Sequence, residues 1–498
     1  MTTSVFLTNM AWVFLFANWV LEWNWREKFA DFRHNRPLHA ILALAGVYLL
    51  WSIGSDNTGQ TLEVLRIKMP LLAIPLVVLT SKPLQRREAL CVAATYLATV
   101  FTVSFVGLGR YLTIPDLPYR DIVPHISNIR FGLNICFAIV LLAYQAYRHP
   151  RPWRVAATVA GILWLLAFLL MLRGYTAFII LMVLALVLPI AYRRRLPKVT
   201  RRVALAIGIA VWLLMAGTAL YYYHDYYTLR TPSTVAVLPP LTANGNAYLH
   251  RQDGLIENGN YVHQYVCEKE MRSEWQKVSS YPFDSLTPVG YTVYPALLRY
   301  LNALGATKDS LGMQCLTPDD IAAIEQGIAN PVYLQRGPRK LFYVLFYEYE
   351  NYRCFRSVSN FSTLQRLELW EAGWTAFTRH PLTGVGTGDV NDALQMELVK
   401  MQSPLAGSGL HLHNQYLTFL VAFGSLGFLV IAFFFVRAWA KGRMCRSMLF
   451  TAHLAIVLIS FWGDNTLSTL AGITFVALGY SLLGTITITK TKTAPAQL

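Results

Sequence analysis

The chemically most informative stretch of the sequence is His411-Leu-His413-Asn414-Gln-Tyr416, which runs directly into the apolar segment 417–436. Asn is a favourable helix N-cap residue, so His413 is predicted to lie just outside the positive end of a membrane helix. The electrostatic field at this positive helix end disfavours the imidazolium form of His413. A neutral imidazole can accept a proton near pH 7. The same field attracts an anionic group. By position alone, an interfacial histidine without a catalytic task is an equally good interpretation.

Four other charged residues are candidates for binding substrate. Arg173 stands in a very short turn between two apolar runs, where an ionisable side chain either reaches the surface or points into a wet cavity. Arg366 lies on a predicted helix one turn before Trp370, although an exposed helical Arg is usually solvated surface. Arg130 and Asp464 lie at helix ends and are secondary candidates for substrate binding.

These residue types indicate a division of labour. Arginines hold phosphate oxygens in a bidentate grip, and a diphosphate with neutralised charge leaves without an acid. The attacking hydroxyl benefits from a base, so the set favours transfer from a lipid-linked diphosphate to an alcohol, without a cofactor. His411 and His413 offer two metal ligands without nearby carboxylates, and the six cysteines show no metal-binding spacing, so no metal site is expected.

Two groups of glycines near these residues have structural explanations. Gly384-Val-Gly-Thr-Gly388 follows no predicted strand and lies in no crossover unit, so we interpret it as a tight turn and not as a dinucleotide-binding fingerprint. Gly424 and Gly427 are most simply explained by close helix packing.

The composition is that of a polytopic membrane protein. Of 498 residues, 55% are hydrophobic and 14% are charged, and the mean hydropathy is +0.39. A soluble domain carries about 25% charged residues. The net charge of +16 does not indicate nucleic-acid binding here, because the basic residues fall in short loops between apolar runs.

Hydropathy predicts an all-α fold with eleven membrane helices, and the spans that are short for a bilayer have weak boundaries. The predicted spans are 4–21, 38–53, 69–80, 89–108, 129–147, 155–172, 174–192, 203–222, 415–436, 447–462 and 467–488. Lys and Arg concentrate in alternate loops, of which 193–202 carries six basic residues and no acids. Such loops are cytoplasmic, which places the long segment 223–414 outside.

The chain is therefore expected to have three parts: an N-terminal transmembrane bundle at 1–222, a periplasmic domain at 223–414 and C-terminal transmembrane helices at 415–498. The outer segment is too long for a passive connector. Thr317-Pro-Asp-Asp320 predicts a helix start with a Thr cap, and a second helix is predicted after Ser362 or Thr363. We expect this domain to be mainly helical.

The motifs resemble those of the O-antigen ligase and O-antigen polymerase superfamily. His413-Asn414 with Gly424-x-x-Gly427 resembles its His-Asn…Gly-x-x-Gly signature. Arg366-Leu-Glu-Leu-Trp370, followed by residues 380–388, resembles its Arg…Trp…Pro…Gly-x-Gly block. Leu172-Arg173-Gly174 resembles its Ser-Arg-Gly turn, with Leu in place of Ser. Segments 244–251, 257–262 and 463–475 further resemble the Bacteroidetes-type branch.

The resemblance implies a metal-independent, inverting glycosyltransferase with a membrane fold of the GT-C type and eleven to twelve helices. It implies an undecaprenyl diphosphate-linked donor and transfer on the periplasmic side of the bacterial inner membrane. Our first hypothesis for the acceptor is lipid A–core oligosaccharide, as in an O-antigen ligase. His413 would activate the acceptor hydroxyl, and Arg173 and Arg366 would bind the diphosphate.

Other functions stay open at this stage. An O-antigen polymerase would use a second lipid-linked repeat as acceptor, and a protein-glycosylating relative would use a protein. The donor chemistry of all three is shared. A transporter or flippase is a further alternative, but it predicts internal repeats and charges deep in the bundle, which the sequence does not show.

Overall fold

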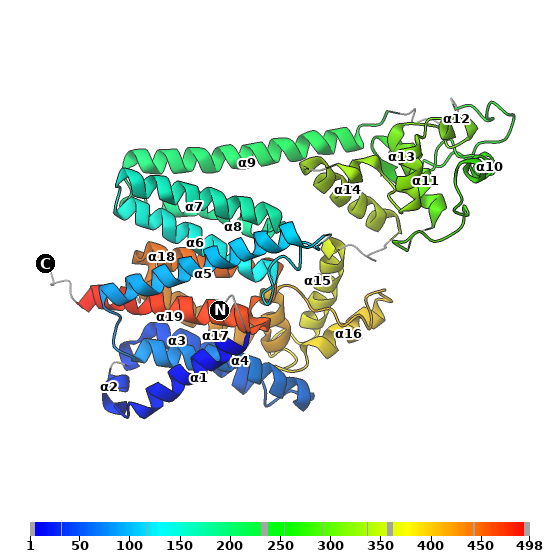
Figure 1. Cartoon of the computed structure of the whole chain (residues 1–498). Helices are drawn as coiled ribbons and strands as arrows, with labels where there is room; N and C mark the ends of the chain where they lie inside the picture. The colour runs from blue at the N-terminus through cyan, green and yellow to red at the C-terminus, as the bar shows by residue number, and fades with distance from the viewer. Residues whose placement is uncertain are drawn as a thin grey trace. The chain divides into compact units, whose positions relative to one another are not determined.

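The computed structural model describes residues 5–30, 32–115, 117–230, 238–252, 254–290, 292–335, 337–355, 362–441 and 444–492. These residues are mostly helical (Figure 1), which confirms the predicted all-α class. The chain forms two compact units. The first unit comprises Met1–Ala210 and Glu368–Leu498, and the second unit comprises Val211–Leu367. Residues 368–414 of the predicted outer segment are therefore part of the first unit.

Most helices of the first unit correspond to predicted membrane spans. The helices of this unit are α1 (Val5–Leu21), α2 (Trp25–Ala30), α3 (Arg36–Leu50), α4 (Thr58–Thr80), α5 (Arg86–Thr113), α6 (Asn128–Arg148), α7 (Pro152–Met171), α8 (Tyr175–Ala191), α16 (Val390–Lys400), α17 (Gln415–Lys441), α18 (Met448–Gly463) and α19 (Leu470–Lys492). Among them, α2 and α16 match no predicted span. Short 3-10 turns are η1 (Phe32–His34), η4 (Met444–Arg446) and η5 (Thr466–Ser468). The helices α9 (Lys198–Tyr227) and α15 (Ser362–Arg379) each contribute residues to both units.

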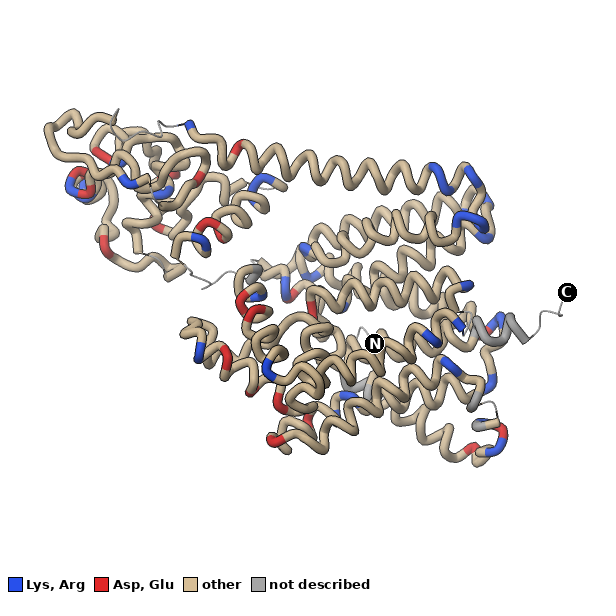
Figure 2. Tube along the Cα trace, turned by 180° about the vertical axis from the view of Figure 1, so that it is seen from behind, with Lys and Arg blue, Asp and Glu red and all other residues tan. Residues whose placement is uncertain are grey.

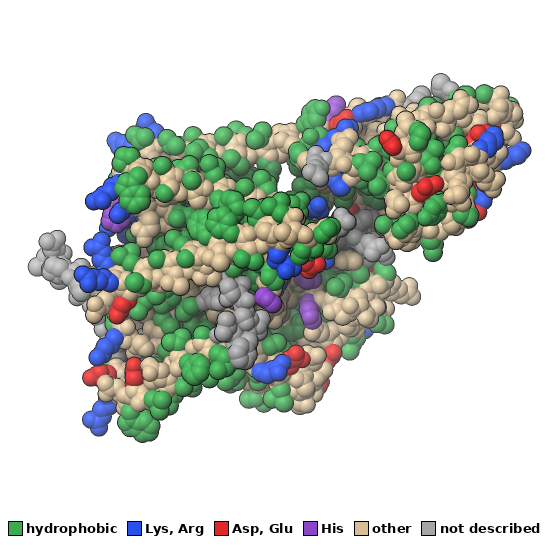
Figure 3. All heavy atoms as spheres, viewed as in Figure 1, with side chains coloured by type: hydrophobic (Ala, Val, Ile, Leu, Met, Phe, Trp, Pro, Cys, Tyr) green, Lys and Arg blue, Asp and Glu red, His purple; other side chains and the backbone are tan. Residues whose placement is uncertain are grey.

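Five helices in the described part of the chain are long and apolar enough to cross a membrane: α5, α6, α7, α9 and α17. Shorter apolar helices include Arg36–Leu50, Tyr175–Ala191 and Met448–Gly463. Large hydrophobic side chains such as Leu163 and Leu170 of α7 are exposed, and Figure 3 shows broad hydrophobic areas along the helices. A lipid environment explains such surfaces, so the prediction of a polytopic membrane protein is confirmed.

The predicted span 69–80 is too short. Helix α4 begins at Thr58, where the Asn57 side chain accepts a hydrogen bond from Gln60 N at 3.0 Å. The helix then continues through Pro70 and Pro75. Its first turns are polar, so a hydropathy pattern misses them, although the cap is readable as Asn before a helical run. This extension brings the polar side of α4 into the site described below.

The basic loops of the first unit meet at one end of its helices. The Arg36 side chain donates to Lys441 O, and the Arg195 side chain donates to Arg446 O. Tyr147 Oη donates to Arg195 O at 2.8 Å, which joins a third pair of loops. Figure 2 shows Lys and Arg gathered at this end, where α8 ends and α9 begins. The predicted alternation of basic loops therefore has a structural counterpart.

The second unit is small and mainly helical. It contains β1 (Ile256–Glu257), β2 (Asn260–Tyr261), α10 (Glu268–Val278), α11 (Val293–Leu304), α12 (Ser310–Met313), α13 (Pro318–Glu325), η3 (Pro331–Leu334) and α14 (Pro338–Phe355). The two short strands pair antiparallel. Its core surrounds Trp275 and Tyr300. The predicted cap of α13 is confirmed, because Thr317 Oγ1 accepts from Asp320 N at 3.2 Å and the Asp320 carboxylate accepts from Thr317 N at 2.9 Å.

A closed polar network lies inside the second unit. The Glu257 side chain is 1% exposed and accepts two hydrogen bonds from Arg299, at 2.8 and 3.0 Å. Asn330 Nδ2 donates to the same carboxylate at 2.7 Å. The Arg299 guanidinium also lies 3.4 Å from the centre of the Tyr347 ring. Both charged groups are thus buried with their hydrogen bonds used, as stable buried ion pairs require.

Candidate active site

A broken membrane helix forms the base of the candidate site. Helix α17 is interrupted at Gly424, whose φ is 62° and ψ is −171°. The segment 381–386 supplies the hydrogen bonds that the break removes. Val385 N and Gly386 N donate to the carbonyls of residues 421 and 422, both at 2.9 Å. Ser425 N donates to Pro381 O at 2.8 Å. Discontinuous helices are tolerated at membrane depth only when the freed backbone groups are satisfied in this way.

The glycines of the two motifs make this pairing possible. A Cβ on Gly424 would lie 2.2 Å from Leu382 O, and a Cβ on Gly384 would lie 2.5 Å from Ala422 C. Gly384 also has a φ of 68°, in the left-handed region that favours glycine. Close helix packing is present at Gly427, where a Cβ would lie 3.3 Å from Val47 of α3. Gly424 instead packs against the 381–386 segment and breaks the helix, which the sequence did not predict.

His413 lies immediately before this helix, as predicted. Asn414 Oδ1 accepts from Leu417 N at 3.0 Å and caps α17. His413 itself has a φ of 49°, which is unusual for a non-glycine residue and is common at functional sites. Trp370 Nε1 donates to Leu412 O at 2.8 Å, so the tryptophan of α15 holds the backbone next to His413.

The side chains of His413, Asp464 and Arg130 lie in a row, which we call the His413 row. His413 Nδ1 lies 3.8 Å from Asp464 Oδ1, and Arg130 Nη2 lies 3.0 Å from Asp464 Oδ2. The Asp464 side chain is 5% exposed and the His413 ring is 35% exposed. The 3.8 Å separation is longer than a hydrogen bond, yet catalytic contacts are often long before substrate binds. The structure therefore brings His413, Asp464 and Arg130 together, with His413 Nδ1 toward the carboxylate.

Arg173 lies on a turn that packs against the start of α6. Its guanidinium lies 4.8 Å from the centre of the Tyr119 ring, and its φ is 52°. Asn128 Nδ2 donates to Tyr119 O at 2.6 Å and to Leu172 O at 3.4 Å, which ties this turn to the segment before Arg130. Arg120 Nε donates to Tyr119 Oη at 3.2 Å. Sequence reasoning missed Arg120, because a charged residue in a loop carries no motif.

Arg366 lies on α15 and belongs to the second unit, one helical turn before Trp370 of the first unit. Its place on the same helix as this tryptophan follows the predicted motif. A role for Arg366 stays a prediction.

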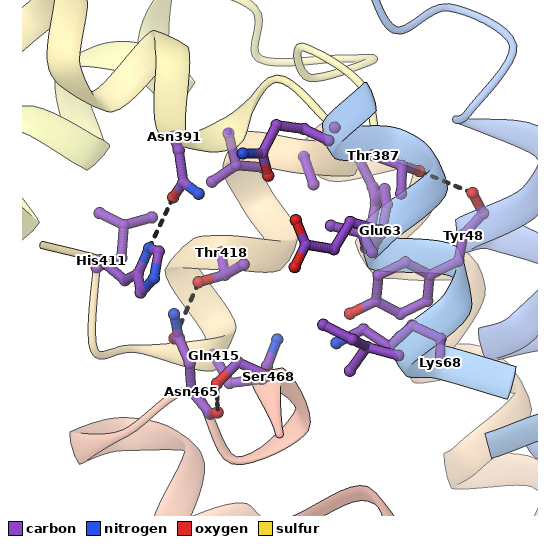
Figure 4. A pocket seen from close by; sticks show the side chains of 18 residues that line it. Tyr48, Glu63, Lys68, Thr387, Asn391, His411, Gln415, Thr418, Asn465 and Ser468 are labelled. Atoms are coloured by element: carbon purple, nitrogen blue, oxygen red, sulfur yellow. Dashed lines mark hydrogen bonds between the residues drawn. The ribbon is translucent and has the colours of Figure 1, made fainter. Parts of the chain in front are cut away.

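A cavity of about 350 Å³ opens inside the first unit (Figure 4). Helix α4 contributes Gln60, Glu63 and Lys68 to its wall, whereas α16 contributes Asn391 and the loop before α17 contributes His411. Of these five side chains, only His411 was considered from the sequence, and it was given no role beyond being a neighbour of His413. The α4 residues escaped notice because the start of that helix was missed.

The ring of His411 has a defined hydrogen bond. His411 Nδ1 lies 3.0 Å from Asn391 Oδ1. His411 is exposed, yet partial burial lowers its pKa below 6.5, and the nearby His413 lowers it further. A neutral ring is therefore favoured at pH 7. Within the described residues, no group of three or more His, Cys, Asp or Glu side chains is arranged to hold a metal.

Comparison with known proteins supports one family. Residues 327–432 match the family model described as O-antigen ligase. The matched segment contains Arg366, Trp370, the glycines of the 381–388 segment, His413 and the Gly424 break. No curated protein matches the chain. The resemblance to the O-antigen ligase superfamily is thereby confirmed, and this family implies a glycosyltransferase-type enzyme.

Proposed function

We propose that this protein transfers a glycan from an undecaprenyl diphosphate-linked donor to a hydroxyl of lipid A–core oligosaccharide. The observation that carries the proposal is the O-antigen ligase match over residues 327–432, which includes His413 at the mouth of a membrane helix. The contact of His413 with the buried Asp464 supports it, because a base needs a group that orients its ring.

In this reaction His413 accepts the proton of the acceptor hydroxyl as its oxygen attacks the anomeric carbon. The bond between that carbon and the diphosphate oxygen breaks, and undecaprenyl diphosphate leaves with the electron pair. Direct attack inverts the anomeric centre. Asp464 faces His413 Nδ1 and so directs Nε2 away, toward the position that an acceptor hydroxyl would occupy.

Arg173 and Arg366 are proposed to bind the donor diphosphate, and Arg130 and Asp464 are proposed as secondary contacts to substrate. Guanidinium groups neutralise phosphate charge and fix its orientation, so the leaving group requires no metal. Arg130 is engaged by Asp464, whereas Arg173 is exposed beside Tyr119. We expect transfer to continue at an unchanged rate in excess EDTA. Loss of activity that added Mg²⁺ restores would contradict metal-independent transfer.

The site is proposed to face the periplasm from the bacterial inner membrane. The basic loops gather at one end of the first-unit helices, and cytoplasmic loops carry the excess of Lys and Arg. A cysteine placed at Ser408, in the loop before His411, should react with a membrane-impermeant thiol reagent in intact spheroplasts. Labelling only after the membrane is opened would reverse the orientation.

The function is tested by transfer in vitro with purified protein in nanodiscs. The donor is an undecaprenyl diphosphate-linked glycan, and lipid A–core and a second lipid-linked repeat are offered separately as acceptors. We expect a glycan joined to lipid A–core. Polymer growth without lipid A–core would identify a polymerase and overturn the ligase proposal.

A further inference from the structure

The cavity beside the His413 row differs from an anion site in its charges. Figure 4 shows the Glu63 carboxylate pointing into the cavity, between His411 and Thr418 on one side and Tyr48 on the other. Lys68 lines the same cavity, where its Nζ donates to Leu467 O and lies 5.2 Å from the centre of the Tyr48 ring. The Glu63 side chain is 55% exposed, and Arg66 Nη2 lies 4.0 Å from its Oε1. With one carboxylate and one amine side chain, the cavity wall has no excess of positive charge for a diphosphate, which distinguishes it from the arginines proposed to bind phosphate.

We infer that this cavity binds a neutral sugar residue of the acceptor glycan, with His411 and Glu63 accepting hydrogen bonds from its hydroxyl groups. This inference rests on the proposed function and names a subsite for it. The cavity volume of about 350 Å³ is at the lower end of small-molecule pockets, which span about 300–1,000 Å³. Such a space suits a compact ligand.

The hydrogen bond to Asn391 fixes which nitrogen of His411 faces the ligand. Asn391 Oδ1 can only accept, so His411 Nδ1 carries the proton. Nε2 of the neutral ring is then an acceptor. In the same wall, the amides of Gln60 and Asn391 provide donors. Sugar hydroxyls both donate and accept, so a mixed wall of this kind complements them better than it complements an anion.

The cavity is adjacent to the proposed base along two segments of chain. Leu412 and Asn465 line it, and the next residues are His413 and Asp464. Thr418 Oγ1 donates to Asn465 Oδ1 at 3.0 Å, which holds the two segments together at this wall. A sugar bound in the cavity therefore lies against the two segments that carry His413 and Asp464.

Saturation-transfer NMR on the full chain in nanodiscs tests the ligand class without requiring turnover. The probes are a panel of neutral methyl pyranosides, with inorganic pyrophosphate as competitor. We expect a glycoside signal from the wild type that pyrophosphate leaves unchanged and that Glu63→Gln reduces at least threefold. Glu371→Gln, an exposed glutamate of α15 outside the cavity, is the matched control and should keep the signal.

The outcomes separate the two proposals. Absence of any glycoside signal, or its displacement by pyrophosphate, overturns the sugar subsite even when transfer is observed. A glycoside signal that depends on Glu63, in a protein that transfers no glycan to any acceptor, leaves the subsite intact and overturns the transferase proposal.

Transfer kinetics test the role of His411 as an acceptor of a hydrogen bond. The amide oxygen of His411→Gln can replace Nε2, whereas His411→Asn is too short to reach the ligand. We expect KM for the acceptor to rise about threefold in His411→Gln and tenfold or more in His411→Asn, which corresponds to the loss of one hydrogen bond. KM for the donor should stay constant in both. Equal KM values for the acceptor in both variants, or a rise in KM for the donor alone, would contradict the assignment.

Discussion

Glu257 in the second unit and Asp464 in the first unit are both buried carboxylates beside an arginine, yet their surroundings differ. Both oxygens of Glu257 accept hydrogen bonds, from Arg299 and Asn330. Asp464 Oδ2 lies 3.0 Å from Arg130 without an aligned hydrogen bond, and Oδ1 lies 3.8 Å from His413. Both oxygens of Glu257 are thus hydrogen-bonded, whereas Asp464 Oδ2 has no hydrogen-bond partner among the described residues. Buried polar groups with unused hydrogen-bonding capacity need an explanation, and a functional site provides one.

The largest effect on stability should come from breaking the closed network. Glu257→Ala leaves the Arg299 guanidinium buried without its partner, which costs about 3–5 kcal/mol. Hydrogen exchange of the α11 amides measures the local loss. The control is Glu268→Ala, because Glu268 is 51% exposed and pairs with Arg272 at the surface, where an ion pair contributes at most about 1 kcal/mol. Equal exchange in the two variants would mean that the network is not structural.

Arg173→Lys should impair transfer severely, because Lys keeps the charge and loses the bidentate geometry. A charge-assisted hydrogen bond contributes about 1.5–3 kcal/mol, so kcat/KM for the donor should fall about tenfold to a hundredfold. Arg148→Lys, at the opposite end of the bundle, is the control. If Lys at position 173 supports wild-type transfer, the diphosphate role of Arg173 is wrong.

Asp464→Asn should lower kcat about tenfold, because it removes the negative charge that faces both Arg130 and His413 while preserving the shape of the side chain. KM for the acceptor should change little. Steady-state transfer at several acceptor concentrations separates the two parameters. A change confined to KM would indicate that Asp464 contacts the substrate and does not orient His413.

The smallest effect concerns acid stability of the second unit. Burial raises the pKa of the Glu270 carboxyl, but hydrogen bonds outweigh this effect and lower the pKa from 4.5 to about 2. The donors are Thr242 Oγ1, Asn246 Nδ2 and Ser310 N. Because the folded-state pKa is below the unfolded one, the ionised carboxyl stabilises the fold fully above pH 4.5, and this stabilisation is lost as the pH falls toward 2.

Comparison of the wild type with Glu270→Gln isolates that contribution from those of other carboxyls. The difference in exchange protection of α10 between the two proteins should shrink as the pH falls from 4.5 toward 2. A difference independent of pH would show that ionisation of Glu270 does not contribute.

The sequence predicted most of the membrane helices, the basic loops and the residues just before α17, because hydropathy, charge and capping are local signals. Asn414 caps α17 as predicted, and His413 lies before it. The sequence did not predict that His413 lies beside Asp464. The two residues come together only because α17 packs beside the turn that follows α18. The sequence also did not single out Glu63, because the polar start of α4 has no hydropathy signal. That Glu63 and His411 line the same cavity depends on tertiary structure.

The most direct test compares glycan transfer by the wild type and by His413→Ala in the same nanodisc preparation, with His149→Ala at the basic end as control. Loss of a general base lowers the rate about 100- to 10,000-fold, and both variants should keep the wild-type unfolding temperature. Transfer at the wild-type rate by His413→Ala would contradict the assignment of His413 as the base.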